Sequence, residues 1–279
     1  MPEADNWFVE KFESEGTCFG LRVRQKIHDE QSEYQRIEVY ETDTFGRLMT
    51  LDGCVMVTDR EHLFYHEVMA HGALLRHKAP QRVVIIGGGD CGTLSEVLKH
   101  AEVKQAVQVE LDERVTRVSE RFFPELCAGN QDSRARLCFE DGAAWIKRAE
   151  PGSVDVIIID STDPIGPAAV LFSDAFLQAC NAALSENGIL IQQSESPLLH
   201  AESVIAPLRA TLSRVGFPNS QTLQFPQPGY PSGWWSATLG YKGTWVREVN
   251  DARLAALPLR YLNRSTYTAT EALPPFMAS

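Results

Sequence analysis

Residues 83–92, with the sequence Val-Val-Ile-Ile-Gly-Gly-Gly-Asp-Cys-Gly, constrain the fold of this chain more than any other stretch. Four consecutive apolar residues predict a buried central strand. The glycines, which include Gly87 and Gly89, allow a sharp turn before a helical pattern starts at Thr93. A strand, a glycine turn and a helix form the βα unit that receives a nucleoside ligand at the carboxyl end of its strand. Dehydrogenases and methyltransferases share this unit, so the turn alone does not identify the ligand.

Asp90 in this turn narrows the choice of ligand. Its carboxylate disfavours a pyrophosphate and repels the carboxylate of S-adenosylmethionine, whereas it attracts a ligand with an ammonium group at the same place. The alternative interpretation is that Asp90 only caps the helix that follows.

Glu110 ends the next predicted strand, about 20 residues beyond the glycine turn, where an acidic residue can bind ribose hydroxyls. The alternative is an acid at the end of a strand that faces solvent. The first interpretation predicts that a nucleoside binds across these two strand ends.

From Arg82 onward the chain alternates predicted strands and helices. The predicted strands are 83–87, 105–110, 136–139, 154–160 and 188–193. The predicted helices are 93–100, 112–122, 142–149, 173–184 and 201–215. This order predicts an α/β fold with a doubly wound, mostly parallel sheet. We expect two later segments, near 219–225 and 234–241, to form an antiparallel edge.

Residues 1–60 differ from the rest, because short segments with partial alternation are separated by turn signals. These segments are 18–26, 34–41, 47–51 and 55–58. We predict a small antiparallel β domain over 1–60 and a Rossmann-like domain over 61–279. The helical pattern at 61–77 would connect them, and Ala79-Pro80 would end that helix.

Composition limits the kinds of partner and the cellular compartment that we expect. The 279 residues carry a formal net charge of −11, which argues against a nucleic-acid partner and favours small cationic substrates. No apolar run has the length of a transmembrane helix, and the start has no signal region, so we expect a cytoplasmic protein without a membrane partner. Cys54, Cys138 and Cys180 are predicted to be buried thiols. No cluster has the spacing of a metal site, so we expect no metal.

Acidic residues recur where predicted strands end. Asp160 ends the strand 154–160, Asp163 follows it in a loop rich in proline and glycine, and Asp141 follows the strand 136–139. Ligands of α/β sheets bind at this edge, and carboxylates there can hold a cation or accept a proton. The alternatives are a helix cap and a turn aspartate. Together with Asp90 and Glu110, these residues predict five acids around one cleft.

Five motifs, taken together and in this order along the chain, resemble those of the spermidine synthase family of polyamine aminopropyltransferases. They are Ser-Glu-Tyr-Gln at 32–35, Leu-Asp-Gly at 51–53, Gly-Gly-Gly-Asp-Cys-Gly at 87–92, Asp-Ser-Thr-Asp-Pro-Ile-Gly-Pro-Ala at 160–168 and Tyr-Pro-Ser-Gly at 230–233. The resemblance extends from about Trp7 to beyond Gly240. It implies an N-terminal β domain followed by a methyltransferase-like Rossmann domain.

The resemblance also implies a reaction. The family transfers the aminopropyl group of decarboxylated S-adenosylmethionine, which is a co-substrate, to a diamine such as putrescine. Spermidine and 5′-methylthioadenosine result, with no cofactor. The family commonly forms homodimers or homotetramers through its N-terminal region. Cadaverine, agmatine or spermidine are alternative acceptors.

Residue roles carry over by the same resemblance. Asp160 matches the proton acceptor. The positions that bind the nucleoside donor match Gln35, His66, Gly87, Gly89, Asp90, Glu110, Asp141, Gly142 and Pro167. The positions around the amine match Tyr65, Asp163, Tyr230, Gln193, Glu195, Trp7 and Glu10.

Two departures from the family pattern bear on the ligand pockets. Cys91 stands where glycine is usual and is expected either to crowd the methionine-derived tail of the donor or to pack. Trp234-Trp235 is bulkier than expected and affects the predicted acceptor pocket. Two other functions stay open on the sequence: a methyltransferase that uses intact S-adenosylmethionine, and a non-catalytic polyamine-binding protein on the same scaffold.

Overall fold

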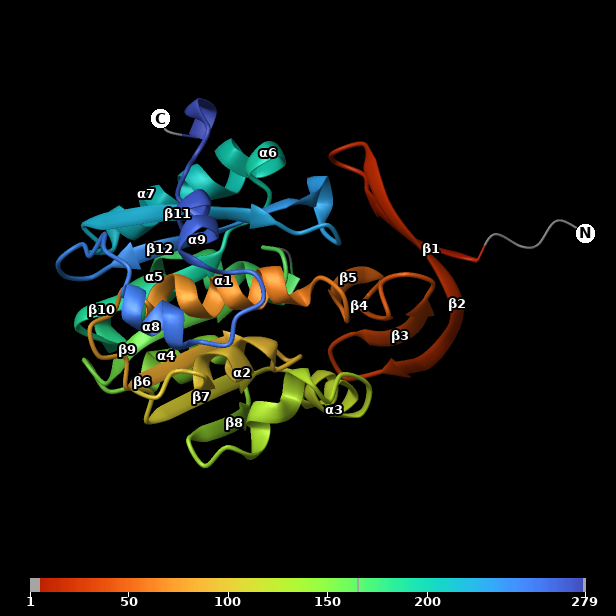
Figure 1. Cartoon of the computed structure of the whole chain (residues 1–279), viewed down its shortest axis with the longest axis horizontal. Coiled ribbons are helices and arrows are strands. Elements are labelled where there is room, and N and C mark those ends of the chain that lie inside the picture. Colours follow the sequence, from red (N-terminus) through yellow and green to blue (C-terminus); the bar gives the residue numbers. More distant parts are fainter. Residues whose placement is uncertain (1–5, 165, 278–279) are drawn as a thin grey trace, which may run out of the picture.

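The computed structural model describes residues 6–164 and 166–277, and the side chain of Pro167 lies outside the described part. Two sheets lie side by side (Figure 1). A five-stranded sheet holds residues 7–58, and a seven-stranded sheet with helices on both faces holds residues 82–241. The predicted combination of a small β domain and a Rossmann-like domain is confirmed. The division at residue 60 remains a prediction.

The small sheet is antiparallel throughout, with strands in chain order. Its strands are β1 (Trp7–Phe12), β2 (Thr17–Gln31), β3 (Arg36–Thr42), β4 (Arg47–Leu51) and β5 (Cys54–Thr58). The long strand β2 pairs with β1 through its first half and with β3 through its second half. The β1–β2 hairpin therefore extends beyond the rest of the sheet (Figure 1).

The large sheet has the strand order β11-β12-β10-β9-β6-β7-β8. Its strands are β6 (Arg82–Gly87), β7 (Gln105–Glu110), β8 (Ala135–Phe139), β9 (Val154–Asp160), β10 (Leu184–Gln193), β11 (Asn219–Pro226) and β12 (Trp234–Tyr241). Strands β6 to β10 pair in parallel, whereas β12 runs antiparallel to both of its neighbours. The predicted antiparallel pair at the edge is thus present.

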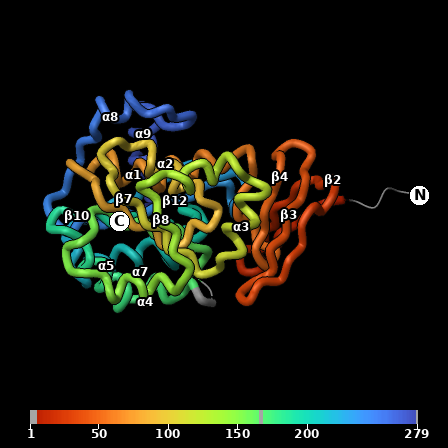
Figure 2. Tube along the Cα trace, turned by 90° about the horizontal axis from the view of Figure 1, so that it is seen from below, coloured from red at the N-terminus to blue at the C-terminus, as the bar shows by residue number. Residues whose placement is uncertain are grey.

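Helices cover both faces of this sheet. They are α1 (His62–Leu74), α2 (Gly92–Leu98), α3 (Glu113–Phe122), α4 (Gly142–Arg148), α5 (Asp174–Ala183), α6 (Pro197–His200), α7 (Ala206–Arg214), α8 (Asp251–Ala256) and α9 (Arg264–Thr270). Figure 2 shows α1, α2, α8 and α9 on one side, and α4, α5 and α7 on the other. Each side has its own apolar core. Helix α3 instead packs its apolar side chains against the small sheet, in one cluster with Ile37 and Val39.

The prediction of one continuous helix over 201–215 is wrong. The chain forms α6, a π-helical turn η3 (Ala201–Ile205) and then α7. Pro207 explains the interruption, because proline has no N–H to donate to the preceding turn. Residues 166–172 of the predicted loop form a 3-10 helix, η2 (Gly166–Phe172), and further 3-10 turns are η1 (Leu126–Gln131), η4 (Pro231–Gly233) and η5 (Pro275–Met277).

The prediction of three buried thiols holds only for Cys180. Cys54 is exposed and Cys138 is half-buried. Cys54 begins β5 directly after a hairpin turn and borders a cavity, so its apolar neighbours along the sequence do not cover it. All six cysteines are free thiols.

Glu67, buried in α1, fastens the C-terminal segment to the large domain. Its carboxylate accepts hydrogen bonds from the backbone N–H groups of Arg260 (2.8 Å), Tyr261 (3.1 Å) and Leu262 (2.8 Å). One carboxylate thereby satisfies three donors that have no place in a helix or strand. The same helix carries Tyr65, which is why this tether also bears on the cavity described below.

We expect Glu67→Gln to lower the free energy of unfolding by about 1.5–3 kcal/mol, because it replaces charge-assisted hydrogen bonds and presents an amide N–H to backbone donors. Urea denaturation followed by circular dichroism measures the change. Glu113→Gln, on the exposed face of α3, is the matched control. Equal stability of the two variants would contradict a stabilising role for Glu67.

Candidate active site

A cavity of about 480 Å³ lies between the carboxyl ends of β6, β7 and β9 and the inner side of the small sheet. The chain winds from β6 through β7 to β8 in one direction and from β9 to β10 in the other. The strand order therefore reverses between β6 and β9, and ligands of open α/β sheets bind at such a point. All five predicted acids line this cavity: Asp90, Glu110, Asp141, Asp160 and Asp163.

The glycine turn is locked against the end of β9. Gly87 lies opposite Asp160 in the paired strands, and the carbonyl of Asp160 accepts the N–H of Gly88 at 2.8 Å. Gly87 has a φ of 83°, and a Cβ atom on it would lie 2.1 Å from that carbonyl oxygen. Only glycine fits here, so the sequence of the turn fixes the position of Asp160.

The carboxylate of Asp160 is held by two hydroxyls. Tyr65 donates to Oδ1 at 2.7 Å, and Thr93, at the start of α2, donates to Oδ2 at 2.6 Å. Burial and the neighbouring Asp90 raise the pKa of Asp160. A carboxyl group with this environment is suited to accept a proton from a bound ligand.

Asp90 precedes Cys91, the N-cap residue of α2, and its side chain both contacts the first turn of this helix and faces the cavity. Its Oδ1 accepts the N–H of Gly92 at 2.8 Å, and its Oδ2 lies 3.1 Å from Nε2 of His66. Burial opposes charge on His66, but the carboxylate of Asp90 prevails and raises the pKa of the imidazole to about 9. His62 lies behind, 3.3 Å from Nδ1 of His66. Burial and the charge of His66 lower the pKa of His62 to about 4.

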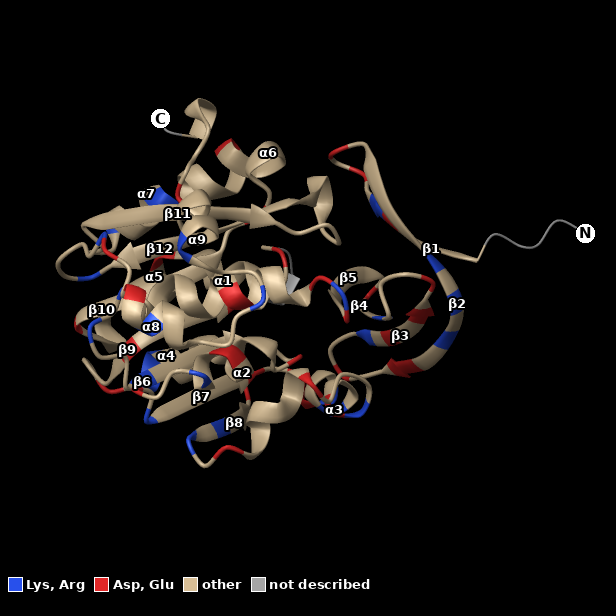
Figure 3. Cartoon of the chain, viewed as in Figure 1, with Lys and Arg blue, Asp and Glu red and all other residues tan. Residues whose placement is uncertain are grey.

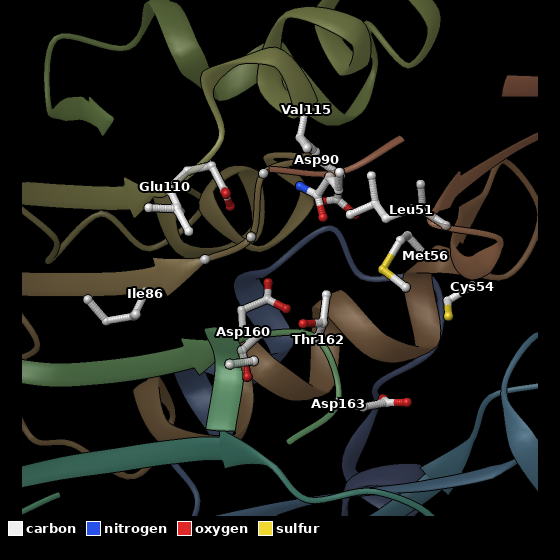
Figure 4. Close-up of a pocket in the computed structure, with 18 of the residues that line it drawn as sticks. Leu51, Cys54, Met56, Ile86, Asp90, Glu110, Val115, Asp160, Thr162 and Asp163 are labelled. Atoms are coloured by element: carbon white, nitrogen blue, oxygen red, sulfur yellow. The ribbon is translucent and has the colours of Figure 1, made fainter. Parts of the chain in front are cut away.

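Glu110 occupies the opposite side of the turn. Figure 4 shows its carboxylate and those of Asp90 and Asp160 directed into the same space. Burial raises the pKa of Glu110 to about 7, and Oε1 accepts the N–H of Asp112 at 2.9 Å. Asp112 in turn accepts the side-chain amide of Gln35 at 3.0 Å, so the small sheet is joined to the cavity at this point.

Asp141 and Gly142 lie at the start of α4. Asp141 is the N-cap of this helix, with Oδ1 accepting the N–H of Ala143 at 2.7 Å, and it also lines the cavity. The capping and site interpretations of Asp141 are therefore both compatible with its position.

A second, smaller cavity of about 40 Å³ adjoins the first, because the two share the residues Cys54, Met56, Tyr65, Ser161, Thr162, Asp163 and Tyr230. Glu10 and Gln193, both predicted to lie near an amine, line it. Burial raises the pKa of Glu10 to about 7. Tyr230 lines both cavities and donates to the carbonyl of Met56 at 2.7 Å.

Two predicted residues, Trp7 and Glu195, are not brought to either cavity. Trp7 is 49 % exposed on β1, because side chains three positions apart on a strand point to opposite faces and Glu10 takes the inner one. Glu195 is buried behind Gln193, whose side-chain N–H₂ lies 3.2 Å from its Oε1. Pro167 lies in η2, and its side chain is outside the described residues.

The two departures from the family pattern have different outcomes. The Cys91 side chain is fully buried, lies 3.7 Å from the carbonyl of Gly89 and does not line a cavity, so it packs. Trp235 lines the small cavity and contacts the ring of Tyr230. Trp234 points to the other side of β12, against Phe276. Only Trp235 affects the pocket.

Sequence reasoning missed Thr93, Asp112 and His62. The sequence could have indicated Asp112, because this residue precedes a helix and lies two residues after Glu110, the acid that ends a strand. It could not have indicated Thr93, since the role of this residue depends on Asp160, which is 67 positions away in the chain. It could have indicated His62, because this residue lies four residues before His66 and therefore on the same face of the same helix. The apolar wall of the cavity, which includes Leu51, Met56 and Val115, was also missed (Figure 4).

The site is strongly acidic and partly dry. No lysine or arginine among the described residues lines either cavity. Such a site attracts cations and can take a proton from one of them. Within residues 6–164 and 166–277, no three His, Cys, Asp or Glu side chains gather as a metal site would require. No helix in that part of the chain is long and apolar enough to cross a bilayer.

Comparisons with known proteins agree on one family. The model described as "Spermine/spermidine synthase domain" matches residues 62–249, and "Spermidine synthase tetramerisation domain" matches residues 6–59. The chain is 54 % identical over 275 residues to the polyamine aminopropyltransferase of Halorhodospira halophila, covering 98 % of this chain and 99 % of that one. It is 53 % identical over 277 residues to the protein of the same name from Methylococcus capsulatus, covering 99 % and 97 %.

Solved structures give the same result. A crystal structure of spermidine synthase in complex with the transition state analogue AdoDATO is 33 % identical, with a TM-score of 0.91 over 99 % of this chain and 94 % of that one. The crystal structure of spermidine synthase from Thermotoga maritima, also 33 % identical, has a TM-score of 0.89 over the same shares.

We expect Glu110→Gln to stabilise the ligand-free protein at pH 8. A carboxyl whose pKa rises from 4.5 to about 7 on folding binds more protons in the folded state between these values, so stability falls as pH rises through this window. The penalty is about 3 kcal/mol above pH 7 and is absent below pH 4.5. Urea denaturation at pH 4.5 and pH 8 tests this, with the exposed Glu150→Gln as control for the charge change. A variant that is no more stable than wild type at pH 8 would show that Glu110 is well solvated.

Proposed function

Because the chain belongs to the spermidine synthase family of polyamine aminopropyltransferases, we propose that it transfers the aminopropyl group of decarboxylated S-adenosylmethionine to putrescine. The products are spermidine and 5′-methylthioadenosine. One observation carries the proposal. An acidic cavity, with no lysine or arginine among the described residues that line it, lies at the point where the strand order reverses, and Asp90 and Asp160 face each other across it.

The donor end of the proposed site uses the strand ends of the large sheet. Glu110 would accept hydrogen bonds from the ribose hydroxyls. Gln35 and Asp141, with Gly142, border the same region, and Leu51 and Val115 supply apolar surface for the base and the sulfur substituents. Asp90 would pair with the ammonium at the end of the aminopropyl chain.

The chemical step follows from charge. Putrescine is a dication at neutral pH, and an ammonium has no lone pair. Asp160 takes one proton from the attacking nitrogen. The neutral amine then attacks the methylene next to the sulfonium, the C–N bond forms as the C–S bond breaks, and the sulfur keeps the electron pair. The positive charge passes from sulfur to the new secondary amine, and the carboxylates offset repulsion between the two bound cations.

Putrescine is favoured as acceptor because the small cavity is short and bordered by Glu10, Asp163 and Tyr230. Asp163 and Glu10 are placed to hold the ammonium that does not react. Cadaverine, agmatine and spermidine remain alternatives. Release of 5′-methylthioadenosine with a panel of these amines, with products identified by mass spectrometry, tests both the reaction and the acceptor.

The proposed setting is the cytoplasm, because all six cysteines are free thiols. The proposed assembly is a homodimer or homotetramer formed through the small sheet. The description of the family model that matches residues 6–59 supports this, as do the exposed Trp7 and Val9 on the outer side of β1.

We expect Asp160→Asn to lower turnover at least about 10²-fold, the usual scale of general base catalysis, because an amide of the same shape cannot take the ammonium proton. The affinity for 5′-methylthioadenosine, measured by calorimetry, should stay within a few-fold of wild type. Asp174→Asn, in a surface pair with Arg214, is the matched control. Near-normal turnover of the Asp160 variant would remove this residue from its role.

Donor choice separates aminopropyl transfer from methyl transfer. We expect wild type to bind decarboxylated S-adenosylmethionine about two decades more tightly than the intact form, because a carboxylate on the same carbon would lie near Asp90 in a partly dry site. His66 already offsets part of the charge of Asp90, which limits the difference. Asp90→Asn should reduce the difference in affinity between the two donors.

Competition binding of both donors measures this ratio. Glu110→Gln is the control, because both donors carry the ribose and should weaken together. Equal affinity of wild type for the two donors would defeat the role given to Asp90 and favour the methyltransferase.

A further inference from the structure

The tip of the β1–β2 hairpin reaches α6 behind the small cavity. Figure 3 shows acidic residues at this tip, and Figure 1 shows the tip directed toward α6. Oε1 of Glu15 lies 3.4 Å from Nε2 of His200, although the two residues are 185 positions apart. The other ring nitrogen of His200, Nδ1, lies 3.6 Å from Oε2 of Glu195. One imidazole thus stands between two carboxylates from different parts of the chain.

Glu195 connects this imidazole to the small cavity. It follows β10 with a φ of 67°, which is uncommon for a residue other than glycine, and its side chain is almost fully buried. Its carboxyl is hydrogen-bonded to Gln193 and Asp163, both of which line the small cavity. Moving outward from the cavity, the order is therefore Asp163, Glu195, His200 and Glu15.

His200 has one ring nitrogen without a hydrogen-bond partner among the described residues. Its Nδ1 is buried and makes no hydrogen bond within the described part of the chain, because 3.6 Å is too long for one. Its ring is the only imidazole, ammonium or guanidinium group within ion-pair distance of Glu15 or Glu195 among the described residues. It is held in place through its backbone N–H, which donates to the carbonyl of Ser196 at 2.8 Å.

We propose that His200 closes the outer end of the amine site by joining the hairpin tip to Glu195, and that it thereby restricts the acceptor to a short diamine. This inference rests on the proposed aminopropyl transfer. His200 does not line the small cavity, so it is a positioning residue that determines specificity and not one that touches the reacting atoms.

The physical reason is the placement of charge beyond Asp163. A longer amine such as spermidine would carry additional methylenes and a further ammonium past Glu10 and Asp163, into the space that the imidazole and the hairpin tip fill. Without the imidazole, the carboxylate of Glu15 and the carboxyl oxygens of Glu195 would face that space and accept hydrogen bonds from the extra ammonium. The hairpin also carries Glu10, so loss of the bridge should loosen the group that holds the far end of putrescine.

The test compares wild type, His200→Ala and His200→Gln with 1,3-diaminopropane, putrescine, cadaverine and spermidine as acceptors. We expect His200→Ala to raise the ratio of kcat/KM for spermidine to that for putrescine about tenfold or more, the scale by which one shape difference in a pocket discriminates substrates. The loss with putrescine should be mainly in KM. Glutamine can hydrogen-bond both carboxylates, so His200→Gln should stay closer to wild type.

Two further variants distinguish loss of the bridge from loss of folding. Glu15→Ala breaks the same bridge from the hairpin side without touching the interior, and it should shift the ratio in the same direction even if His200→Ala fails to fold. Glu13→Ala, exposed on the same hairpin tip, is the matched control and should leave the ratio unchanged.

An unchanged order of acceptors in both His200→Ala and Glu15→Ala would overturn the inference. An equal loss with every amine would also overturn it, because a purely structural role predicts that pattern. Failure of the underlying function gives a different result, namely no release of 5′-methylthioadenosine by wild type with any of the four amines.

Discussion

The pairing of β6 with β9 at their carboxyl ends is the contact on which the site depends. It sets Gly87 opposite Asp160 and lets the carbonyl of Asp160 accept the N–H of Gly88. The turn that carries Asp90 and the strand end that carries Asp160 are thereby fixed relative to each other by backbone atoms. A slip of one residue in this pairing would turn the side chain of Asp160 to the other face of the sheet. Positioning of the two acids is therefore a property of the sheet and not of flexible loops.

The acids that this framework holds lower the stability of the ligand-free protein. Burial raises the pKa of Glu10 and Glu110 to about 7 and that of Glu195 to about 9. These shifts mean that folding removes the acidic groups from water without supplying enough cationic partners. The compensation comes from elsewhere, chiefly the two apolar cores on the faces of the large sheet and the tether at Glu67. A bound cation would relieve the deficit, and this links the cost in stability to affinity for cationic ligands.

The sequence predicts those parts of the fold and site that depend on local order. Asp90, Glu110 and Asp160 end or follow apolar runs, and because the ends of parallel strands meet at one edge, their convergence could be predicted. Thr93 could not, since it acts through Asp160, which is distant in the chain. Trp7, which the motif assigned to the amine site together with Glu10, lies on the opposite face of β1 because side chains alternate along a strand. Strand β1 was not predicted at all, and it exists through pairing with β2 alone.

The two ends of the cavity differ in how they are held. The donor end is formed by strand ends of a sheet that is buried on both faces, and Asp112 fixes Gln35 of the small sheet to it. The amine end takes Glu10 from a hairpin whose outer strand has one neighbouring strand. Segments with few partners open at lower free energy than central strands. If the chain has the proposed function, substitutions in the hairpin or in α6 should alter which amine fits while the residues assigned to the donor and to proton transfer stay in place, since the two ends rest on different elements of the fold.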